Sequence, residues 1–146
     1  MAMKTQAVML KARELGKGIP AFNCPYVEMV KPIAEAIKDE NSVALIEVAR
    51  VEWEKFYSQS PERIAEEFHK YKSEGHTFLH LDHIPVIDED YKEVDYMDLI
   101  SRAIKAGFQS VMIDGSRLSL DENIRTTAEA AAMAHEADIP IEAELG

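Results

Sequence analysis

The chain has 146 residues, of which 47% are hydrophobic and 29% charged, as is usual for one soluble globular domain with its own core. Its formal net charge of −11 argues against a nucleic-acid or membrane-surface binder, because those partners attract clustered Lys and Arg. No segment reaches the about 18 apolar residues that cross a bilayer, and the first residues do not resemble a signal peptide. The single cysteine, Cys24, has no partner for an internal disulfide, so we expect a cytoplasmic protein in which this thiol is structural.

Five apolar segments of strand length alternate with helical segments along the chain. The predicted strands are 18–22, 42–49, 78–86, 108–116 and 139–146. The predicted helices are 27–37, 60–72, about 94–106 and a fourth that follows Ser119. Ser60 and Pro61 suit the N-cap and first position of the second helix, and Gly107 suits the position after the third. Pro32 indicates either that the first helix begins near Met29 or that it bends.

Apolar strands joined by helices predict a parallel sheet in an α/β fold. A doubly wound open sheet and a (β/α)8 TIM barrel both fit this pattern. Residues 21–26, AFNCPY, contain no glycine, which disfavours the nucleotide-binding open sheet. Polar side chains instead gather at the strand ends, where a barrel carries its chemistry. They are Asn23, Asp82, His83, Asp114 and Glu144. We therefore expect the first four and a half βα units of a (β/α)8 TIM barrel.

The third predicted strand, FLHLDHIPV, contains two histidines and an aspartate. Strand alternation places His80 and Asp82 on one face, whereas His83 precedes a break at the following proline, which lets its side chain turn toward the strand end. A buried carboxylate is costly unless it is paired, protonated or bound to metal. Asp114 and Glu144 repeat this pattern at the ends of the next two strands. Three adjacent strands that deliver carboxylate or imidazole to one end predict a divalent-metal site.

Several motifs are similar to those of a known enzyme family. The chain resembles the N-terminal half of the class II, zinc-dependent fructose-bisphosphate aldolases, a group that includes tagatose-bisphosphate aldolases. The matching segments are IPAFN (19–23), HLDH (80–83), AGFQSVMIDGSRLSLDENI (106–124), AH (134–135) and IEAELG (141–146). The resemblance covers essentially the whole chain and agrees in the order and spacing of its last blocks.

The resemblance implies a role for each matching residue. His83 is expected to be one of three histidine ligands of a catalytic zinc, which acts as a Lewis acid on the ketone of a small phosphorylated sugar. Asp82 is expected to be the acid and base that removes and returns the C4 hydroxyl proton. Asp114 and Glu144 match the position of a second, non-catalytic divalent or monovalent cation. Asn23 matches an asparagine that contacts substrate.

The second predicted strand departs from the family pattern. The family usually carries Gln-x-Ser at its end, and its serine touches the aldehyde half of the substrate; this chain has Glu47, Val48 and Ala49, followed by Arg50. The loss of a hydroxyl and the gain of a carboxylate at this strand end argue for a substrate other than fructose 1,6-bisphosphate. Arg50 is expected either to bind a substrate phosphate or to be a solvated surface residue. The long loop 84–96, here called the acidic loop, is expected to overhang the strand ends as a lid or an insertion.

Length is the second departure, because a complete barrel needs roughly 250 residues. We therefore expect residues 1–146 to be the N-terminal half of a barrel and to be inactive alone. The edge strand left unpaired favours association with another copy of the chain. Two further functions stay open, a non-catalytic half-barrel interaction module and another metal-dependent lyase or isomerase of sugar phosphates.

Overall fold

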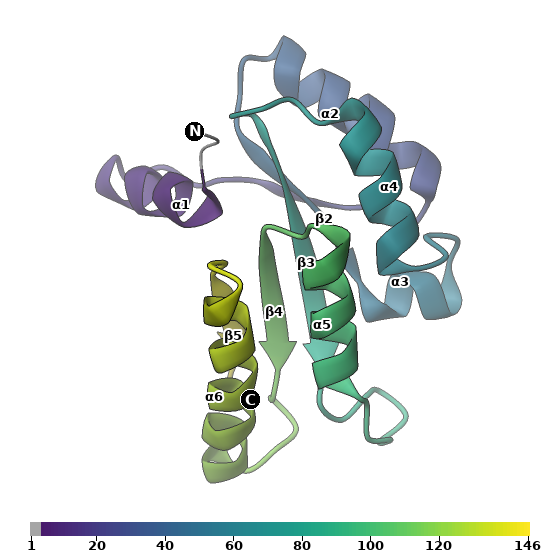
Figure 1. The fold of residues 1–146 in the computed structure, drawn as a ribbon, viewed down its shortest axis with the longest axis vertical. Helices are drawn as coiled ribbons and strands as arrows, with labels where there is room; N and C mark the ends of the chain where they lie inside the picture. The colour runs from purple at the N-terminus through teal and green to yellow at the C-terminus, as the bar shows by residue number, and fades with distance from the viewer. Residues whose placement is uncertain (1–3) are drawn as a thin grey trace.

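The computed structural model describes residues 4–146, which form a five-stranded sheet flanked by helices (Figure 1). The strands are β1 (Ala21–Asn23), β2 (Ala44–Ala49), β3 (Thr77–Pro85), β4 (Ser110–Asp114) and β5 (Ile141–Glu144). The helices are α1 (Thr5–Glu14), the short 3-10 helix η1 (Val27–Met29), α2 (Val30–Asp39), α3 (Arg50–Lys55), α4 (Pro61–Tyr71), α5 (Tyr96–Ala106) and α6 (Leu120–Glu136). None of the helices in this described part is long and apolar enough to cross a membrane.

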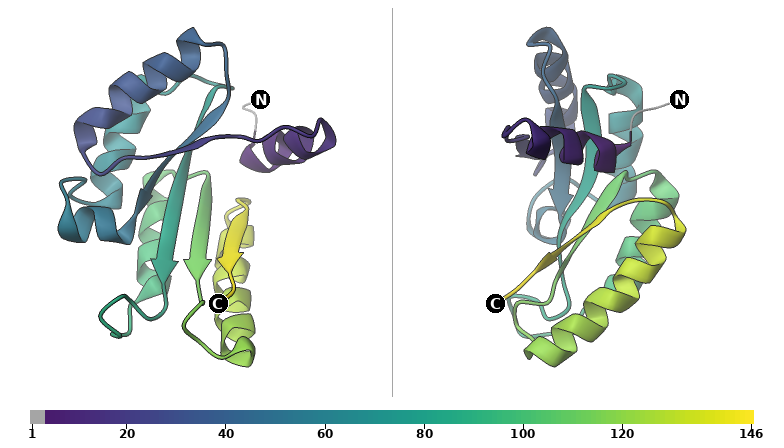
Figure 2. Two further views of the ribbon diagram at one scale, coloured as in Figure 1. Left: turned by 180° about the vertical axis from the view of Figure 1, so that it is seen from behind. Right: turned by 90° about the vertical axis from the view of Figure 1, so that its left-hand side faces the viewer.

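The strand order identifies the architecture. The strands lie in the order β1-β2-β3-β4-β5, and each is parallel to its neighbour. A doubly wound sheet reverses its strand order at a switch point, whereas each strand here is added on the same side of the preceding one. Seen from behind, β3, β4 and β5 stand in front of the helices that connect them (Figure 2). The predicted α/β fold, with the first four and a half units of a (β/α)8 barrel, is confirmed.

The core lies between the sheet and the helices that cover it. Apolar residues at helical spacing on α2, α4, α5 and α6 pack against the buried side chains of β2, β3 and β4. The largest fully buried side chains of this layer are Phe68, Ile46, Ile64, Leu79, Leu81, Ile84, Ile100 and Ile113. Burial of each such side chain contributes about 1.5–3 kcal/mol, so this layer fixes the positions of the strand ends.

The predicted helix boundaries follow from local hydrogen bonds. The Ser60 hydroxyl accepts a hydrogen bond from the Arg63 amide at 3.1 Å, which makes Ser60 the N-cap of α4. Gly107 ends α5 with a φ of 94°, a left-handed conformation that glycine adopts without strain. Pro32 lies in the first turn of α2, as expected if this helix starts near Met29.

Two helices and one strand end differ from the sequence-based expectation. α1 was not predicted, because most of its side chains are exposed and its apolar residues lack a clear period. α3 forms directly after β2, where a loop was expected. β3 does not break at Ile84 but continues to Pro85, and an irregularity between Leu81 and Ile84 shifts its register against β4.

Candidate functional site

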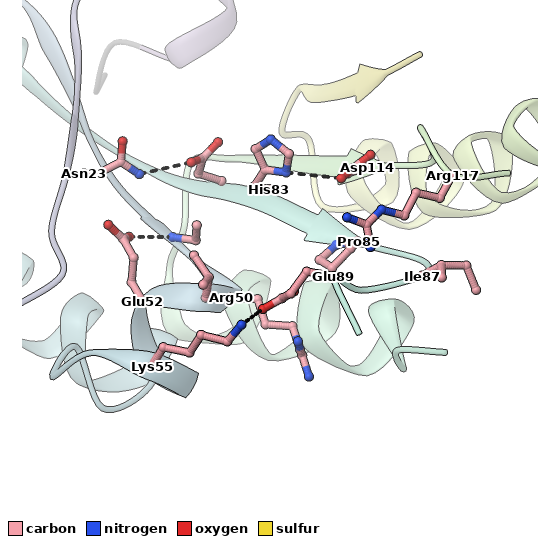
Figure 3. A pocket seen from close by; sticks show the side chains of 13 residues that line it. Asn23, Arg50, Glu52, Lys55, His83, Pro85, Ile87, Glu89, Asp114 and Arg117 are labelled. Atoms are coloured by element: carbon pink, nitrogen blue, oxygen red, sulfur yellow. Dashed lines mark hydrogen bonds and ion pairs between the residues drawn. The ribbon is translucent and has the colours of Figure 1, made fainter. Parts of the chain in front are cut away.

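A cavity of about 460 Å³ opens at the carboxyl ends of β1 to β4 (Figure 3). Parallel strands of a barrel deliver their last side chains to this end, so residues far apart in sequence meet there. The cavity is lined by Asn23, Ala49, Arg50, Val51, Glu52, Lys55, Asp82, His83, Pro85, Ile87, Glu89, Asp114 and Arg117. Five of the six residues predicted for the site are among them, and the sixth, Glu144, contacts His83.

His83 lies between two carboxylates from neighbouring strands. Its Nδ1 is 3.2 Å from Oδ2 of Asp114 on β4, and its Nε2 is 3.2 Å from Oε2 of Glu144 on β5. The residue has a φ of 48°, a left-handed conformation that is uncommon for histidine, and it sits at the register shift of β3. The orientation of His83 was predicted, but the expected cause, a strand break at the proline, was wrong. The bulge turns the side chain instead.

These three side chains have the donor chemistry of a divalent-metal site. One ligand atom from each of His83, Asp114 and Glu144 lies within 4.8 Å of the others. One imidazole with two carboxylates suits zinc or a harder divalent cation. The amide N–H of Ser116 donates to Oδ1 of Asp114 at 2.8 Å, which orients that carboxylate from outside the cluster. His83, Asp114 and Glu144 therefore fit the divalent-metal site that the sequence predicts.

Asp82 stands beside this cluster on the wall of the cavity. It is partly exposed, and its Oδ2 accepts a hydrogen bond from Nδ2 of Asn23 at 3.1 Å. Asn23 comes from β1, on the far side of β2. Asn23 was predicted to contact substrate; in the structure it is exposed at the cavity and holds one oxygen of Asp82.

A second cluster of titratable groups lies beneath the cavity floor. Ligand atoms of Glu47, His80 and Asp82 lie within 4.8 Å of one another, and both Glu47 and His80 are buried. Nδ1 of His80 is 2.8 Å from the hydroxyl of Ser110, and burial lowers the pKa of the ring, which keeps it neutral. Burial, followed by the charge of Asp82, raises the pKa of Glu47 to about 7. The sequence analysis placed His80 and Asp82 on one face of a strand and noted Glu47 as a departure from the family pattern, but it did not predict that the three side chains meet.

Glu52 is a further buried acid that sequence reasoning missed. Its carboxylate accepts a hydrogen bond from the Ala49 amide at 2.8 Å and so satisfies the free N–H at the start of α3. Burial raises its pKa, while this hydrogen bond acts in the opposite direction. Cys24 is fully buried, and burial raises the pKa of its thiol to about 12, in agreement with the expected structural role.

The acidic loop overhangs the cavity as expected and is held there by three cations. Nη1 of Arg50 is 3.5 Å from Oδ2 of Asp88, and Lys55 pairs with Glu89. Arg117 donates to the backbone carbonyl of Asp88 and lies over the ring of Tyr91. Arg50 is therefore neither free nor fully solvated; it lines the cavity while it is paired with the loop.

The comparison with protein families shows to which family the chain belongs. The sequence model described as "Fructose-bisphosphate aldolase class-II" matches residues 3–146. The chain belongs to this family. The "Fructose-bisphosphate aldolase" of Helicobacter pylori (strain ATCC 700392 / 26695) is 32% identical over 146 residues, which are 100% of this chain and 44% of that protein. The "D-tagatose-1,6-bisphosphate aldolase subunit GatY" of Klebsiella oxytoca is 28% identical over 144 residues, which are 99% of this chain and 47% of that protein.

Solved structures of aldolases have the same fold over about half of their length. The YdjI aldolase from Escherichia coli K12 superposes with a TM-score of 0.77 at 25% identity over 100% of this chain and 53% of its own. A putative fructose-1,6-biphosphate aldolase from Coccidioides immitis gives a TM-score of 0.73 at 27% identity over 96% of this chain and 45% of its own. This class II aldolase chain spans less than half the length of the curated relatives.

Proposed function

We propose that this chain is part of a zinc-dependent class II ketose-bisphosphate aldolase, in which residues 1–146 are the N-terminal half of the barrel. The enzyme cleaves a phosphorylated ketose to dihydroxyacetone phosphate and an aldehyde, and it catalyses the reverse condensation. The observation that carries the proposal is the convergence of His83, Asp114 and Glu144 beside Asp82 at one cavity. The names of relatives that act on fructose and tagatose bisphosphates support this substrate class.

Asp82 is the proposed acid and base. Asn23 occupies one of its carboxylate oxygens, which leaves the other oxygen to take the C4 hydroxyl proton during cleavage and to return it during condensation. The same hydrogen bond fixes the direction of the carboxylate. The reaction therefore places the C4 hydroxyl of the substrate within hydrogen-bond distance of this second oxygen.

His83 is the proposed zinc ligand of this half of the barrel, and Asp114 with Glu144 are the proposed ligands of a second, non-catalytic cation. Bound zinc supplies Lewis-acid polarisation of the ketone carbonyl. Each carboxylate lies 3.2 Å from one of the two imidazole nitrogens, so one of these contacts must be given up to the zinc, and the other carboxylate then orients the ring.

Arg50 is the proposed partner of a substrate phosphate. A chain with a net charge of −11 needs local cations to bind an anionic sugar, and Arg50 lines the cavity. Its pair with Asp88 must be exchanged for the pair with the phosphate. Ala49 leaves the same end of β2 without the serine hydroxyl of the usual family pattern, so we propose a substrate that differs from fructose 1,6-bisphosphate on the aldehyde side.

A cleavage assay on the full-length protein that contains this sequence tests the proposal. Fructose 1,6-bisphosphate, tagatose 1,6-bisphosphate and ketose monophosphates are offered with zinc and with a chelator, and released dihydroxyacetone phosphate is measured. We expect zinc-dependent cleavage of at least one bisphosphate. We expect Asp82→Ala and His83→Ala each to lower kcat/KM by at least about a hundredfold, because the first removes the proposed acid and base and the second removes a proposed zinc ligand. His69→Ala is the matched control, since His69 is exposed on α4. Absence of cleavage of every ketose overturns the proposal.

A non-catalytic half-barrel interaction module, which pairs with a second copy of the chain, is the second candidate function. We propose a cytoplasmic homo-oligomer for the full-length protein. A stable, metal-free oligomer without activity in the cleavage assay would favour the module over the enzyme. A third possibility, a metal-dependent lyase or isomerase of sugar phosphates, would appear as turnover of a monophosphate without aldol cleavage.

A further inference from the structure

The two cations of α3 face two consecutive acids of the acidic loop. Nη1 of Arg50, the first residue of α3, is 3.5 Å from Oδ2 of Asp88. Lys55, the last residue of the helix, pairs with Glu89. Arg50 and Lys55 line the cavity on the side opposite His83 (Figure 3). Both cations that α3 brings to the cavity are therefore engaged by carboxylates of the same chain.

The position of Asp88 is fixed by the acidic loop itself. Its Oδ1 accepts hydrogen bonds from the backbone amides of Asp90 and Lys92, both at 2.9 Å, and only 5% of the residue is exposed. The amide of Asp88 donates to the carbonyl of Lys92 at 2.9 Å and closes the turn. Only the other oxygen, Oδ2, is used for Arg50. Asp88 can therefore give up Arg50 while the loop keeps its shape.

A separate contact holds the loop over the cavity. Arg117 donates to the backbone carbonyl of Asp88, and its guanidinium lies 5.3 Å from the centre of the Tyr91 ring. This contact uses a carbonyl and an aromatic face, so it does not depend on the carboxylate of Asp88 or on that of Glu89. The loop stays in place when the two cations of α3 change partners.

The two ion pairs differ in strength. The side chains of Arg50 and Asp88 are 20% and 6% exposed, whereas those of Lys55 and Glu89 are 50% and 37% exposed. Solvent screens the second pair more, so the first pair is the stronger competitor for an incoming anion. A phosphate group carries about −1.5 to −2 charges and three acceptor oxygens, which is more than one carboxylate offers. A phosphate can therefore displace Asp88 from Arg50, but a neutral group cannot.

We propose that Arg50 and Lys55 form a subsite for the phosphate at the end of the substrate away from the metal, and that Asp88 is a specificity-determining residue that this phosphate displaces. The inference rests on the proposed aldolase function. Asp88 and Glu89 hold the two cations in position before substrate binds and lower the affinity for the phosphate by the same contacts. A ketose with a phosphate at each end uses the subsite, whereas a ketose 1-phosphate leaves both ion pairs intact.

Calorimetric titration of the full-length protein with inorganic phosphate tests the subsite without turnover. We expect Asp88→Asn to bind phosphate about three- to tenfold more tightly than wild type, because Asn keeps an acceptor for the two loop amides but does not hold Arg50 by charge. We expect Glu89→Gln to gain less than about threefold, since its pair with Lys55 is more exposed. Arg50→Gln is expected to weaken phosphate binding and, in the double variant, to abolish the effect of Asp88→Asn.

Asp90→Asn is the matched control. Asp90 is an exposed acid of the same loop that pairs with Lys92, so its replacement removes the same charge without releasing Arg50 or Lys55. We expect it to change the phosphate affinity less than about twofold. An effect as large as that of Asp88→Asn would be a general effect of charge and overturns the proposal. The proposal is also overturned if Asp88→Asn binds phosphate no more tightly than wild type, or if Arg50→Gln binds it equally well.

A comparison of two substrates separates this inference from the aldolase proposal. The value of kcat/KM is measured in wild type and in Asp88→Asn for the ketose bisphosphate that is cleaved best and for the corresponding ketose 1-phosphate. We expect the ratio of the two values to rise about three- to tenfold in the variant, because only the bisphosphate must break the pair of Arg50 with Asp88. A ratio that does not rise overturns the displacement of Asp88. If no ketose is cleaved but the phosphate titrations give the expected result, the proposed reaction fails while the phosphate subsite stands.

Discussion

Replacement of Glu47 by glutamine is expected to remove a large part of the pH dependence of stability. The pKa of this carboxyl rises from 4.5 in the unfolded chain to about 7 in the fold. At about 1.36 kcal/mol per pKa unit, the change corresponds to at most about 3 kcal/mol, and the solvent that reaches this carboxyl lowers the value. Below pH 4.5 both states hold the proton and the fold is not penalised. Between pH 4.5 and 7 the unfolded state ionises first, so the free energy of unfolding falls, and above pH 7 the loss is complete.

Urea or thermal unfolding from pH 4 to 8.5 measures this effect. In wild type we expect a decline of at most about 3 kcal/mol from Glu47 across the interval, and in Glu47→Gln we expect this contribution to be absent, with the variant more stable at pH 8. Glu40→Gln is the matched control, because Glu40 is exposed at the end of α2 and its replacement leaves the decline unchanged. Parallel pH profiles of wild type and Glu47→Gln would refute the reasoning that burial and Asp82 hold the proton on Glu47.

Three further predictions concern other parts of the fold. Arg102→Ala is expected to lower the free energy of unfolding at pH 7 by about 1 kcal/mol, because two hydrogen bonds of 2.7 and 2.9 Å join Arg102 to the partly exposed Glu62. The pKa of Glu62 falls to about 2 through this pair, so the difference should disappear as the pH falls from 4.5 toward 2 in acid titration of stability. Phe68→Ala is expected to cost about 3–5 kcal/mol in urea unfolding, since Phe68 is 1% exposed in the core. Cys24 is expected to resist thiol reagents at pH 8 in the folded protein and to react fully in denaturant, because it is buried and its pKa is raised to about 12. Rapid labelling of the folded chain would contradict that placement.

The repeating elements were predictable because their signals are local. Apolar periodicity gave the five strands and α2, α4, α5 and α6, and single residues such as Ser60 and Gly107 marked helix ends through hydrogen bonds to their immediate neighbours. α1 and α3 were not predicted. α1 is largely exposed and α3 has only six residues, so neither shows a clear apolar periodicity. Their formation depends on capping and on neighbouring segments instead.

The residues at the strand ends of the candidate site were predictable, but the buried Glu47 further inside the barrel was not. Asp82, His83, Asp114 and Glu144 stand at strand ends, and the topology of a parallel barrel brings strand ends together. Glu47 lies one layer further inside, and its importance depends on burial and on the charge of Asp82 across the strand pair. Such properties arise from packing, so the sequence alone showed only an unexpected acid.

The bulge in β3 has a consequence for how the two principal side chains of the cavity are coupled. In a regular strand, consecutive residues face opposite sides, yet Asp82 and His83 line the same cavity. Their Cα atoms are thus one trans peptide unit apart, about 3.8 Å, a spacing set by covalent bonds. Thermal loosening of the surrounding helices changes the cavity walls but leaves this spacing intact. If the sequence changes elsewhere in the barrel, the Asp82 carboxylate and the His83 imidazole still line the same cavity as long as the bulge in β3 is kept.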